Sequence, residues 1–185
     1  FTFLYIKCIF LNMKEYSFLP INSDLTANCH KLNEKNIPNV GSTTLEELSN
    51  SIKNSDFNES IVFDNAVIGF AVCFQDNEKT KLYMNEIKHK NFKEISSRVN
   101  NFLYIDRIVV DDNYRNIKLG TKLYENILIF AKQNSINCLT AEINLLPSIN
   151  KGSFKFHESF GFQEFGKVKY TQDYEVSLQK LLINS

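Results

Sequence analysis

The chain has 185 residues, 43% hydrophobic and 23% charged, which is typical of one globular domain with a sizeable core and excludes a disordered chain. Lys and Arg together number 21, as do Asp and Glu, so the zero net charge gives no sign of a nucleic-acid or anionic-membrane partner. The four cysteines, Cys8, Cys29, Cys73 and Cys138, are scattered without a CxxC pair, so we expect a reducing, cytoplasmic environment.

The first twelve residues, FTFLYIKCIFLN, form an apolar run that Lys7 interrupts and that is too short to span a bilayer. No small-residue cleavage site follows, which disfavours a signal peptide. A more ordinary segment opens at Met13. We therefore expect residues 1–12 to be an upstream extension and residues 13–185 to form a single domain.

The next part of the chain predicts a strand, two helices and a hairpin. A strand is expected over Tyr16–Ile21, and a helix over Asn22–Lys35, where apolar residues recur at helical spacing. Thr44–Lys53 predicts a second helix that opens with a capping box. The apolar runs Glu59–Phe63 and Ala66–Phe74 flank an Asp-Asn pair, which is a signal for a β-hairpin.

Residues 76–100 are polar and mixed in charge, and they predict one weakly patterned helix over Met84–Ile95. Long excursions between core strands frequently carry function. This segment is therefore either a wall of a substrate site or a solvated insertion, and both readings stay open.

The second half opens with the strongest strand, Phe102–Val110, followed by an amphipathic helix over Lys118–Gln133 and a strand over Asn137–Asn144. A strand–helix–strand order implies a right-handed parallel crossover. After Pro147 we expect a short helix over Ser153–Phe160.

Two further strands, Gly161–Phe165 and Val168–Leu178, are expected to complete the domain. The fold class is therefore α+β, with a mixed, mostly antiparallel sheet and helices on both faces.

The segment from Leu103 to Thr121 joins a buried strand, a polar loop and a helix start. Arg115 precedes the helix and Lys118 lies in its first turn, where basic side chains oppose the helix dipole unless an anion is bound. Helix N–H groups at such a place suit a diphosphate, and Thr121 adds a hydroxyl. Neither GxxxxGK[ST] nor GxGxxG is present, which argues against a Walker loop and a dinucleotide fold.

This loop resembles the signature Q/R-x-x-G-x-G/A of the GNAT N-acetyltransferase superfamily. Arg115 fills its first position and Gly120 its last. Lys118 replaces the middle glycine, and Asn116 stands where a glycine is common in the family.

A second segment, from Asn150 to Phe162, resembles the family pattern N-x-x-[AS]-x-x-x-Y-x-x-x-G-F, with His157 in place of the tyrosine. The resemblance covers roughly Tyr16 to Leu182. The runs FLYIDRIVV, EINLLPSIN and FHESFGF look most like a little-characterised bacterial branch of predicted acetyltransferases that also carries this histidine.

The resemblance implies a GNAT fold of six or seven strands that splays between the fourth and fifth strands, with acetyl-CoA as co-substrate and no metal. In the family, main-chain N–H groups of the loop hold the diphosphate and main-chain groups of the fourth strand hold the pantetheine arm. The cofactor-binding residues implied are Ile108, Val109, Val110, Arg115, Asn116, Lys118, Leu119, Gly120, Thr121 and Asn150.

His157 is the first catalytic candidate. The family tyrosine protonates the leaving CoA thiolate, and a histidine titrates near neutral pH and can exchange a proton there. The alternative is that His157 only packs or hydrogen-bonds a carbonyl group.

Asp106 and Glu142 are the other two candidates. By period-2 alternation Tyr104, Asp106, Ile108 and Val110 share one strand face, so Asp106 could act as the general base; alternatively it forms an ion pair with Arg107 or a neighbouring loop. Glu142, with Asn144, is placed to line the same cleft, where it takes part in proton transfer or binds substrate.

The activity expected is direct acetyl transfer from acetyl-CoA to a small-molecule or peptide amine in a ternary complex. The rival is a catalytically silent acyl-CoA-binding module acting as a sensor or scaffold, which the altered glycine loop and the missing tyrosine favour. A nucleic-acid-binding domain is disfavoured by the zero net charge. The histidines lack metal-ligand spacing, and family relatives make a homodimer an option.

Overall fold

The computed structural model describes residues 16–183 and contains a seven-stranded sheet in the order β1-β2-β3-β4-β5-β7-β6. Only β4 and β5 run parallel, whereas the other neighbouring strands are antiparallel. The α+β class and the mixed sheet are thus confirmed, while the expected extension over residues 1–12 lies outside the described residues. The strands are β1 (Ser17–Leu19), β2 (Phe57–Phe63), β3 (Ala66–Gln75), β4 (Phe102–Val110), β5 (Cys138–Leu146), β6 (Gln163–Lys169) and β7 (Glu175–Leu182).

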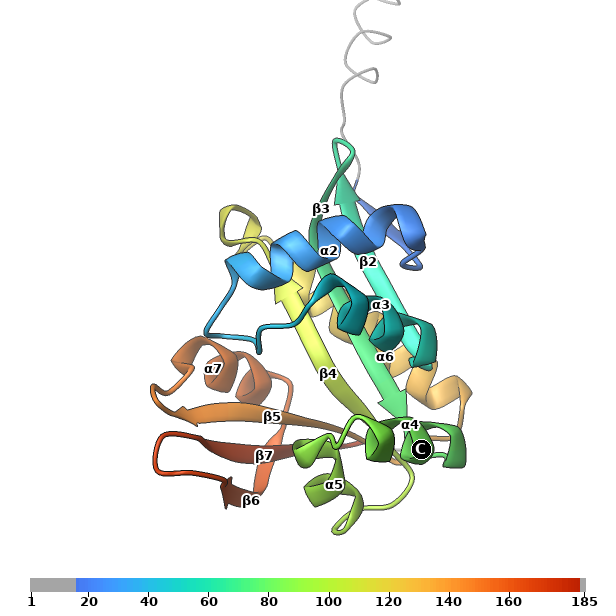
Figure 1. The fold of residues 1–185 in the computed structure, drawn as a ribbon. Helices are drawn as coiled ribbons and strands as arrows, with labels where there is room; N and C mark the ends of the chain where they lie inside the picture. The colour runs from blue at the N-terminus through green and yellow to red at the C-terminus, as the bar shows by residue number, and fades with distance from the viewer. Residues whose placement is uncertain (1–15, 184–185) are drawn as a thin grey trace, which may run out of the picture.

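Helices cover both faces of this sheet, as expected. In Figure 1, α2 and α3 lie in front of β2 to β4, and α6 lies behind them. No helix within residues 16–183 is long and apolar enough to cross a membrane. The helices are α2 (Ser23–Lys35), α3 (Leu45–Asn54), α4 (Glu78–Glu86), α5 (Lys90–Ser96), α6 (Leu119–Gln133) and α7 (Lys151–Ser159).

Each face has its own hydrophobic core. On the face of α2 and α3, Leu48 packs with Phe70. On the opposite face, Leu123 and Ile127 of α6 pack with Leu103 of β4. Because residues along a strand point alternately to the two faces, the central strands are buried on both sides.

Local signals explain where the early elements begin. The Asn22 side chain caps α2, and Thr44 and Glu47 form the expected capping box of α3. Asp64 and Asn65 have φ values of 53° and 63° between β2 and β3, as a two-residue hairpin turn of the mirror-image type requires. The expected helices and hairpin are confirmed here.

The parallel pair β4–β5 opens into a gap. Only Phe102–Tyr104 pair with Cys138–Thr140, and from there the two strands diverge. In Figure 1 they meet at the lower right and separate toward the left. The expected splay between the fourth and fifth strands is therefore confirmed.

Two element predictions were wrong in detail. The single helix over Met84–Ile95 is divided into α4 and α5, because Lys88 adopts a positive φ of 54° that ends one helix and His89 caps the next. The expected strand Val168–Leu178 is also divided: β6 continues to Lys169 and β7 begins only at Glu175. A short polar turn between them permits the reversal.

Candidate active site

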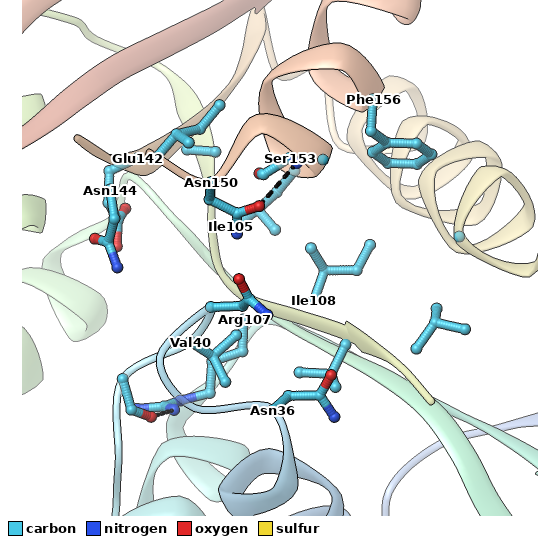
Figure 2. Close-up of a pocket in the computed structure, with 18 of the residues that line it drawn as sticks. Asn36, Val40, Ile105, Arg107, Ile108, Glu142, Asn144, Asn150, Ser153 and Phe156 are labelled. Carbon is cyan, nitrogen blue, oxygen red and sulfur yellow. Dashed lines mark hydrogen bonds between the residues drawn. The ribbon is translucent and has the colours of Figure 1, made fainter. Parts of the chain in front are cut away.

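A cavity of about 890 Å³ lies in the gap between β4 and β5. This volume is toward the upper end of the range of ligand-binding pockets in proteins, so the cavity can hold a large cofactor. Its walls come from the α2–α3 loop, the α4–α5 turn, β4, the start of α6, β5 and α7. Figure 2 shows Glu142 and Asn144 of β5 at the upper left, Val40 of the α2–α3 loop below them, and Ile108 of β4 to the right. Every candidate cofactor-binding or catalytic residue named from the sequence lines this cavity.

The first turn of α6 forms one end of the cavity. Lys118 is its N-cap residue, and no side chain within the described residues caps this helix. The first intrahelical bond joins the Lys122 N–H to the Lys118 carbonyl at 3.0 Å. The N–H groups of Leu119, Gly120 and Thr121 therefore have no intrahelical acceptor, which is the arrangement that binds anions.

The loop before α6 keeps a left-handed shape without glycine. Asn116 and Lys118 have φ values of 66° and 65°, the region that favours glycine. A Cβ on Gly120 would lie 3.4 Å from the Phe156 ring of α7, which is ordinary van der Waals contact, so the space at this position does not require a glycine. Asn116 and Lys118 therefore adopt the backbone conformation of this turn although neither residue is a glycine.

Arg115 ties this loop to its neighbours. Its guanidinium lies 2.6 Å from Asp112 and donates to the Asn36 Oδ1 at 3.2 Å. Asn36 belongs to the α2–α3 loop, so Arg115 joins the two loops that flank this end of the cavity.

A β-bulge interrupts β4 at Asp106. Its neighbours Ile105 and Arg107 pair with consecutive residues of β3, which leaves Asp106 as the extra residue of the bulged strand.

The bulge overturns one expectation about β4. Tyr104 and Val109 pack in the core under α2 and α3, whereas Ile108 and Val110 pack toward α6. The prediction that Tyr104, Asp106, Ile108 and Val110 share one face was therefore wrong, because the extra residue shifts the alternation.

Asp106 is a paired carboxylate. His89 Nε2–H donates to Oδ1 at 3.0 Å, and Arg107 Nε lies 3.3 Å from Oδ2. Burial alone would raise the pKa of Asp106, but the hydrogen bond from His89 and the charge of Arg107 outweigh it, so the pKa is lowered. The ion-pair alternative for Asp106 thus matches its contacts.

Glu142 differs from Asp106 in having an unpaired oxygen. Its Oε2 is buried and has no hydrogen-bond partner within the described residues, and the same holds for the Tyr104 hydroxyl. Burial raises the pKa of Glu142 to about 7; a charge on His89 opposes this rise, Asp106 adds to it, and the nearby Tyr104 hydroxyl and Asn91 amide lower the pKa by smaller amounts. A carboxylate with this pKa can accept a proton near neutral pH.

His157 is held inside the protein from both ring nitrogens. Its Nδ1 lies 2.8 Å from the Ser153 carbonyl oxygen, so Nδ1–H donates there. The Tyr124 hydroxyl then donates to Nε2 at 2.7 Å, and burial lowers the pKa of His157. The side chain is a neutral imidazole in this arrangement, and its role as proton donor stays a prediction.

Two asparagines organise the wall between β5 and α7. Asn150 Oδ1 accepts from the Ser153 N–H at 3.0 Å and so caps α7, as the dashed line in Figure 2 shows. Asn144 Nδ2 donates to the Pro38 carbonyl at 3.4 Å, which connects β5 with the α2–α3 loop.

Several cavity residues were not predicted from the sequence. His89 and Asn91 come from the polar segment 76–100, so the turn between α4 and α5 forms a wall of the cavity. Another part of the same segment faces solvent, since Leu82 of α4 is 72% exposed. Tyr174 and the α2–α3 loop also line the cavity. No local motif marks these residues, because only the tertiary fold brings them to the gap.

The described cysteines and histidines form no reactive or metal-binding cluster. Burial raises the pKa of the Cys29 thiol to about 12 and also raises those of Cys73 and Cys138, as suits small core residues. No group of three or more potential metal ligands occurs within residues 16–183.

Comparison with known proteins agrees with this geometry. Residues 29–162 match the family model described as Acetyltransferase (GNAT) family, whereas no curated protein sequence matches the chain. The ribosomal-protein-S18-alanine N-acetyltransferase from Escherichia coli has a similar fold, with a TM-score of 0.69 over 92% of this chain and 96% of that chain at 14% identity.

Two further solved structures are similar in fold. Ard1 from Thermoplasma volcanium gives a TM-score of 0.72 over 92% of this chain and 99% of that chain, at 10% identity. Arabidopsis thaliana Naa50, in complex with the bisubstrate analogue CoA-Ac-MVNAL, gives 0.66 over 90% and 97%, at 14% identity. Since the family model spans well over half of the sequence and the splayed sheet agrees with it, this chain belongs to the GNAT family of acetyltransferases.

Proposed function

We propose that this protein transfers an acetyl group from acetyl-CoA directly to an amine acceptor held in the same cavity. One observation carries the proposal: a single cavity joins the uncapped start of α6 to the carboxyl group of Glu142, whose Oε2 has no hydrogen-bond partner within the described residues, through the β4–β5 gap. An anion-binding end and a proton-accepting end are the two features that this reaction needs.

The cofactor end would hold the diphosphate on the N–H groups of Leu119, Gly120 and Thr121, with Arg115 and Lys118 supplying positive charge and Asn116 shaping the loop. Acetyl-CoA supplies the acetyl thioester. The Ile108, Val109 and Val110 main chain lies where β4 has left β5, so its second edge faces the cavity and can hydrogen-bond the pantetheine arm. Asn150 adds an amide at the start of α7.

At the acceptor end we assign Glu142 as the general base, acting directly or through a water molecule. It takes one proton from the ammonium group, and the neutral amine nitrogen bonds to the acetyl carbon. As the carbon–sulfur bond breaks, the nitrogen loses its second proton and the departing thiolate takes up a proton, directly or through water, to leave as the thiol. Asp106 already has partners on both oxygens, so we assign it to support Glu142 rather than to the proton transfer itself.

His157 we assign to joining α6 and α7, since both of its ring nitrogens have partners. Its protonation of the thiolate, expected from the family pattern, is the alternative, and a double variant with Tyr124 separates the two roles.

The acceptor class stays broad. Structural neighbours include the Arabidopsis enzyme, crystallised with a peptide-bearing analogue, and an agmatine N-acetyltransferase, so peptide and small amines both belong in the assay. A reducing compartment such as the cytoplasm suits the three buried free thiols Cys29, Cys73 and Cys138.

The test measures thiol release from acetyl-CoA with a panel of small amines and peptides, together with calorimetric binding of acetyl-CoA. We expect binding and amine-dependent release of one thiol per acetylated product. Tight binding without amine-dependent release across the panel would support the silent binding module instead.

A further inference from the structure

His89 lies at the acceptor end of the cavity although it belongs to the polar segment between β3 and β4. The turn between α4 and α5 carries it there, and its ring packs edge-on against Tyr104 with centroids 5.5 Å apart. His89 Nδ1 accepts the Phe92 N–H at 3.2 Å and so caps α5. Asn, Asp and Ser are the usual N-cap residues. A histidine differs from them in having a second ring nitrogen that can form another hydrogen bond while the first caps the helix.

The second ring nitrogen of His89, Nε2, forms this further hydrogen bond. Because Nδ1 accepts a hydrogen bond, Nε2 carries the hydrogen and donates it to Asp106 Oδ1 at 3.0 Å. Arg107 lies 3.3 Å from the other oxygen of Asp106. Arg107 is itself fixed, since its Nη1 donates to the Asn33 Oδ1 and the Gly41 carbonyl, both at 2.8 Å.

The two cavity carboxyl groups are therefore unequal. Both oxygens of Asp106 have a cationic or N–H partner, whereas Oε2 of Glu142 has none within the described residues. Like charges close together oppose each other's ionisation, so an unrestrained Asp106 would compete with Glu142 for protons and for the acceptor.

We propose that His89 is a positioning residue for acetyl transfer: through its Nε2–H it holds Asp106 away from the acceptor and leaves Glu142 as the single carboxylate that takes the proton. This inference rests on the proposed function, and it names a residue outside the family motifs.

The groups that face Glu142 support this assignment. They come from β4, from the α4–α5 turn and α5, and from the segment between β6 and β7, and they are Tyr104, Asp106, His89, Asn91, Tyr170 and Tyr174. Among them the negative charge of Asp106 raises the pKa of Glu142, whereas His89 lowers it only when its ring is protonated. A variant without the Nε2–H donor leaves the Asp106 carboxylate unrestrained beside Glu142, so the pKa of Glu142 moves further upward and a larger fraction is protonated and inactive at neutral pH.

Two substitutions separate the two ring nitrogens. His89→Asn keeps a δ1 acceptor for the Phe92 N–H and removes the donor to Asp106, and Asn is a favourable cap. His89→Gln keeps an ε2 donor for Asp106 and gives up the cap acceptor. Asn77→Ala is the control for helix loss, because Asn77 caps α4 through the Thr80 N–H and does not line the cavity.

The measurements are the pH dependence of kcat/KM and an NMR titration of the labelled Glu142 carboxyl carbon in each variant. For His89→Asn we expect the acid limb and the Glu142 pKa to rise by about one pH unit, with about tenfold lower kcat/KM below the limb and recovery at high pH. His89→Gln should stay close to the parent profile, and Asn77→Ala should leave it unchanged.

An unchanged Glu142 titration in His89→Asn, or a uniform loss of activity in both His89 variants at every pH, would overturn the inference and reduce His89 to a helix cap. The NMR titration does not depend on turnover. A parent protein that acetylates no amine would therefore contradict the proposed function while the role of His89 is still decided.

Discussion

Glu142 and Asp106 lie in one cavity, yet their surroundings give them different chemistry. Asp106 has a lowered pKa beside His89 and Arg107, and Glu142 has a raised pKa of about 7 with a buried, unpaired oxygen. Pairs of ionisable groups with such divergent environments commonly divide acid–base roles in active sites. The unpaired one is the better proton acceptor for an ammonium substrate.

Glu142→Gln should lower kcat by about 10²-fold or more, because a general base contributes on that scale. It should also stabilise the protein. The folded pKa is raised above its unfolded value of about 4.5, so ionisation destabilises the fold progressively as pH rises toward 7. The gain in unfolding free energy should be absent below pH 4 and reach about 1–3 kcal/mol above pH 7.

Steady-state kinetics and urea denaturation at pH 4, 6 and 8 measure both effects. Asp106→Asn is the matched comparison and should lose less kcat. Full activity in Glu142→Gln would refute the assignment of the base.

Lys118 carries backbone strain at the cofactor end. Its φ of 65° costs a residue with a Cβ about 1 kcal/mol relative to glycine. We expect Lys118→Gly to raise the unfolding free energy by about 0.5–1 kcal/mol, as measured by denaturant titration. The same change at Lys122, which lies in the regular helix α6, should lower it by about 1 kcal/mol. Equal signs for the two variants would contradict this account.

At the scale of elements, α6 and α7 meet at a buried polar contact within an aromatic cluster. Tyr124 donates to His157 at 2.7 Å, and its ring contacts Phe156 and Phe160. Since these helices flank the cofactor end of the cavity, the contact fixes their separation.

Tyr124→Phe should lower the unfolding free energy by about 1–2 kcal/mol, because the hydrogen bond to His157 is lost. His157→Phe should cost more, since it leaves the Tyr124 hydroxyl buried and unpaired. The double variant should regain part of this loss, because neither polar atom is then unpaired. Thermal and denaturant unfolding of the three variants test the cycle.

Turnover of the same double variant decides the chemical role of His157. If it only joins the helices, kcat should stay within about threefold of the parent once packing is restored. If it protonates the thiolate, kcat should stay about 10²-fold lower whatever the stability.

The elements that the sequence predicts well are those with local causes. The cap at Thr44, the Asp64-Asn65 turn and the apolar face of α6 each depend on residues a few positions apart. The bulge at Asp106 has no such signal, because it arises from pairing with β3. Because the bulge was not predicted, residues on either side of it were assigned to the same face of β4 although they lie on opposite faces.

Across the whole molecule, the central sheet is paired at one end of β4 and β5 and open at the other. Phe102–Tyr104 hold β4 and β5 together at one end, and their divergence beyond this point creates the cavity. The α2–α3 loop joins the two sides, since Arg115 reaches Asn36 and Asn144 reaches Pro38. The cofactor and acceptor ends therefore share walls.

The amino-acid sequence indicates the cofactor end more completely than the acceptor end. Arg115 to Gly120 and Asn150 to His157 are contiguous motifs, so their residues can be named from the order of amino acids alone. The acceptor end combines His89, Asp106, Glu142 and Tyr174 from four separate segments, and only the folded chain brings them together.

Calorimetric titration of the protein with acetyl-CoA, and then with S-acetylpantetheine, which lacks the diphosphate, tests the central claim most directly. We predict measurable heat with acetyl-CoA and at least about 10²-fold weaker binding of the pantetheine fragment, since charge-assisted contacts at the α6 N-terminus are lost. Absence of heat with acetyl-CoA, or equal affinity for both compounds, would contradict it.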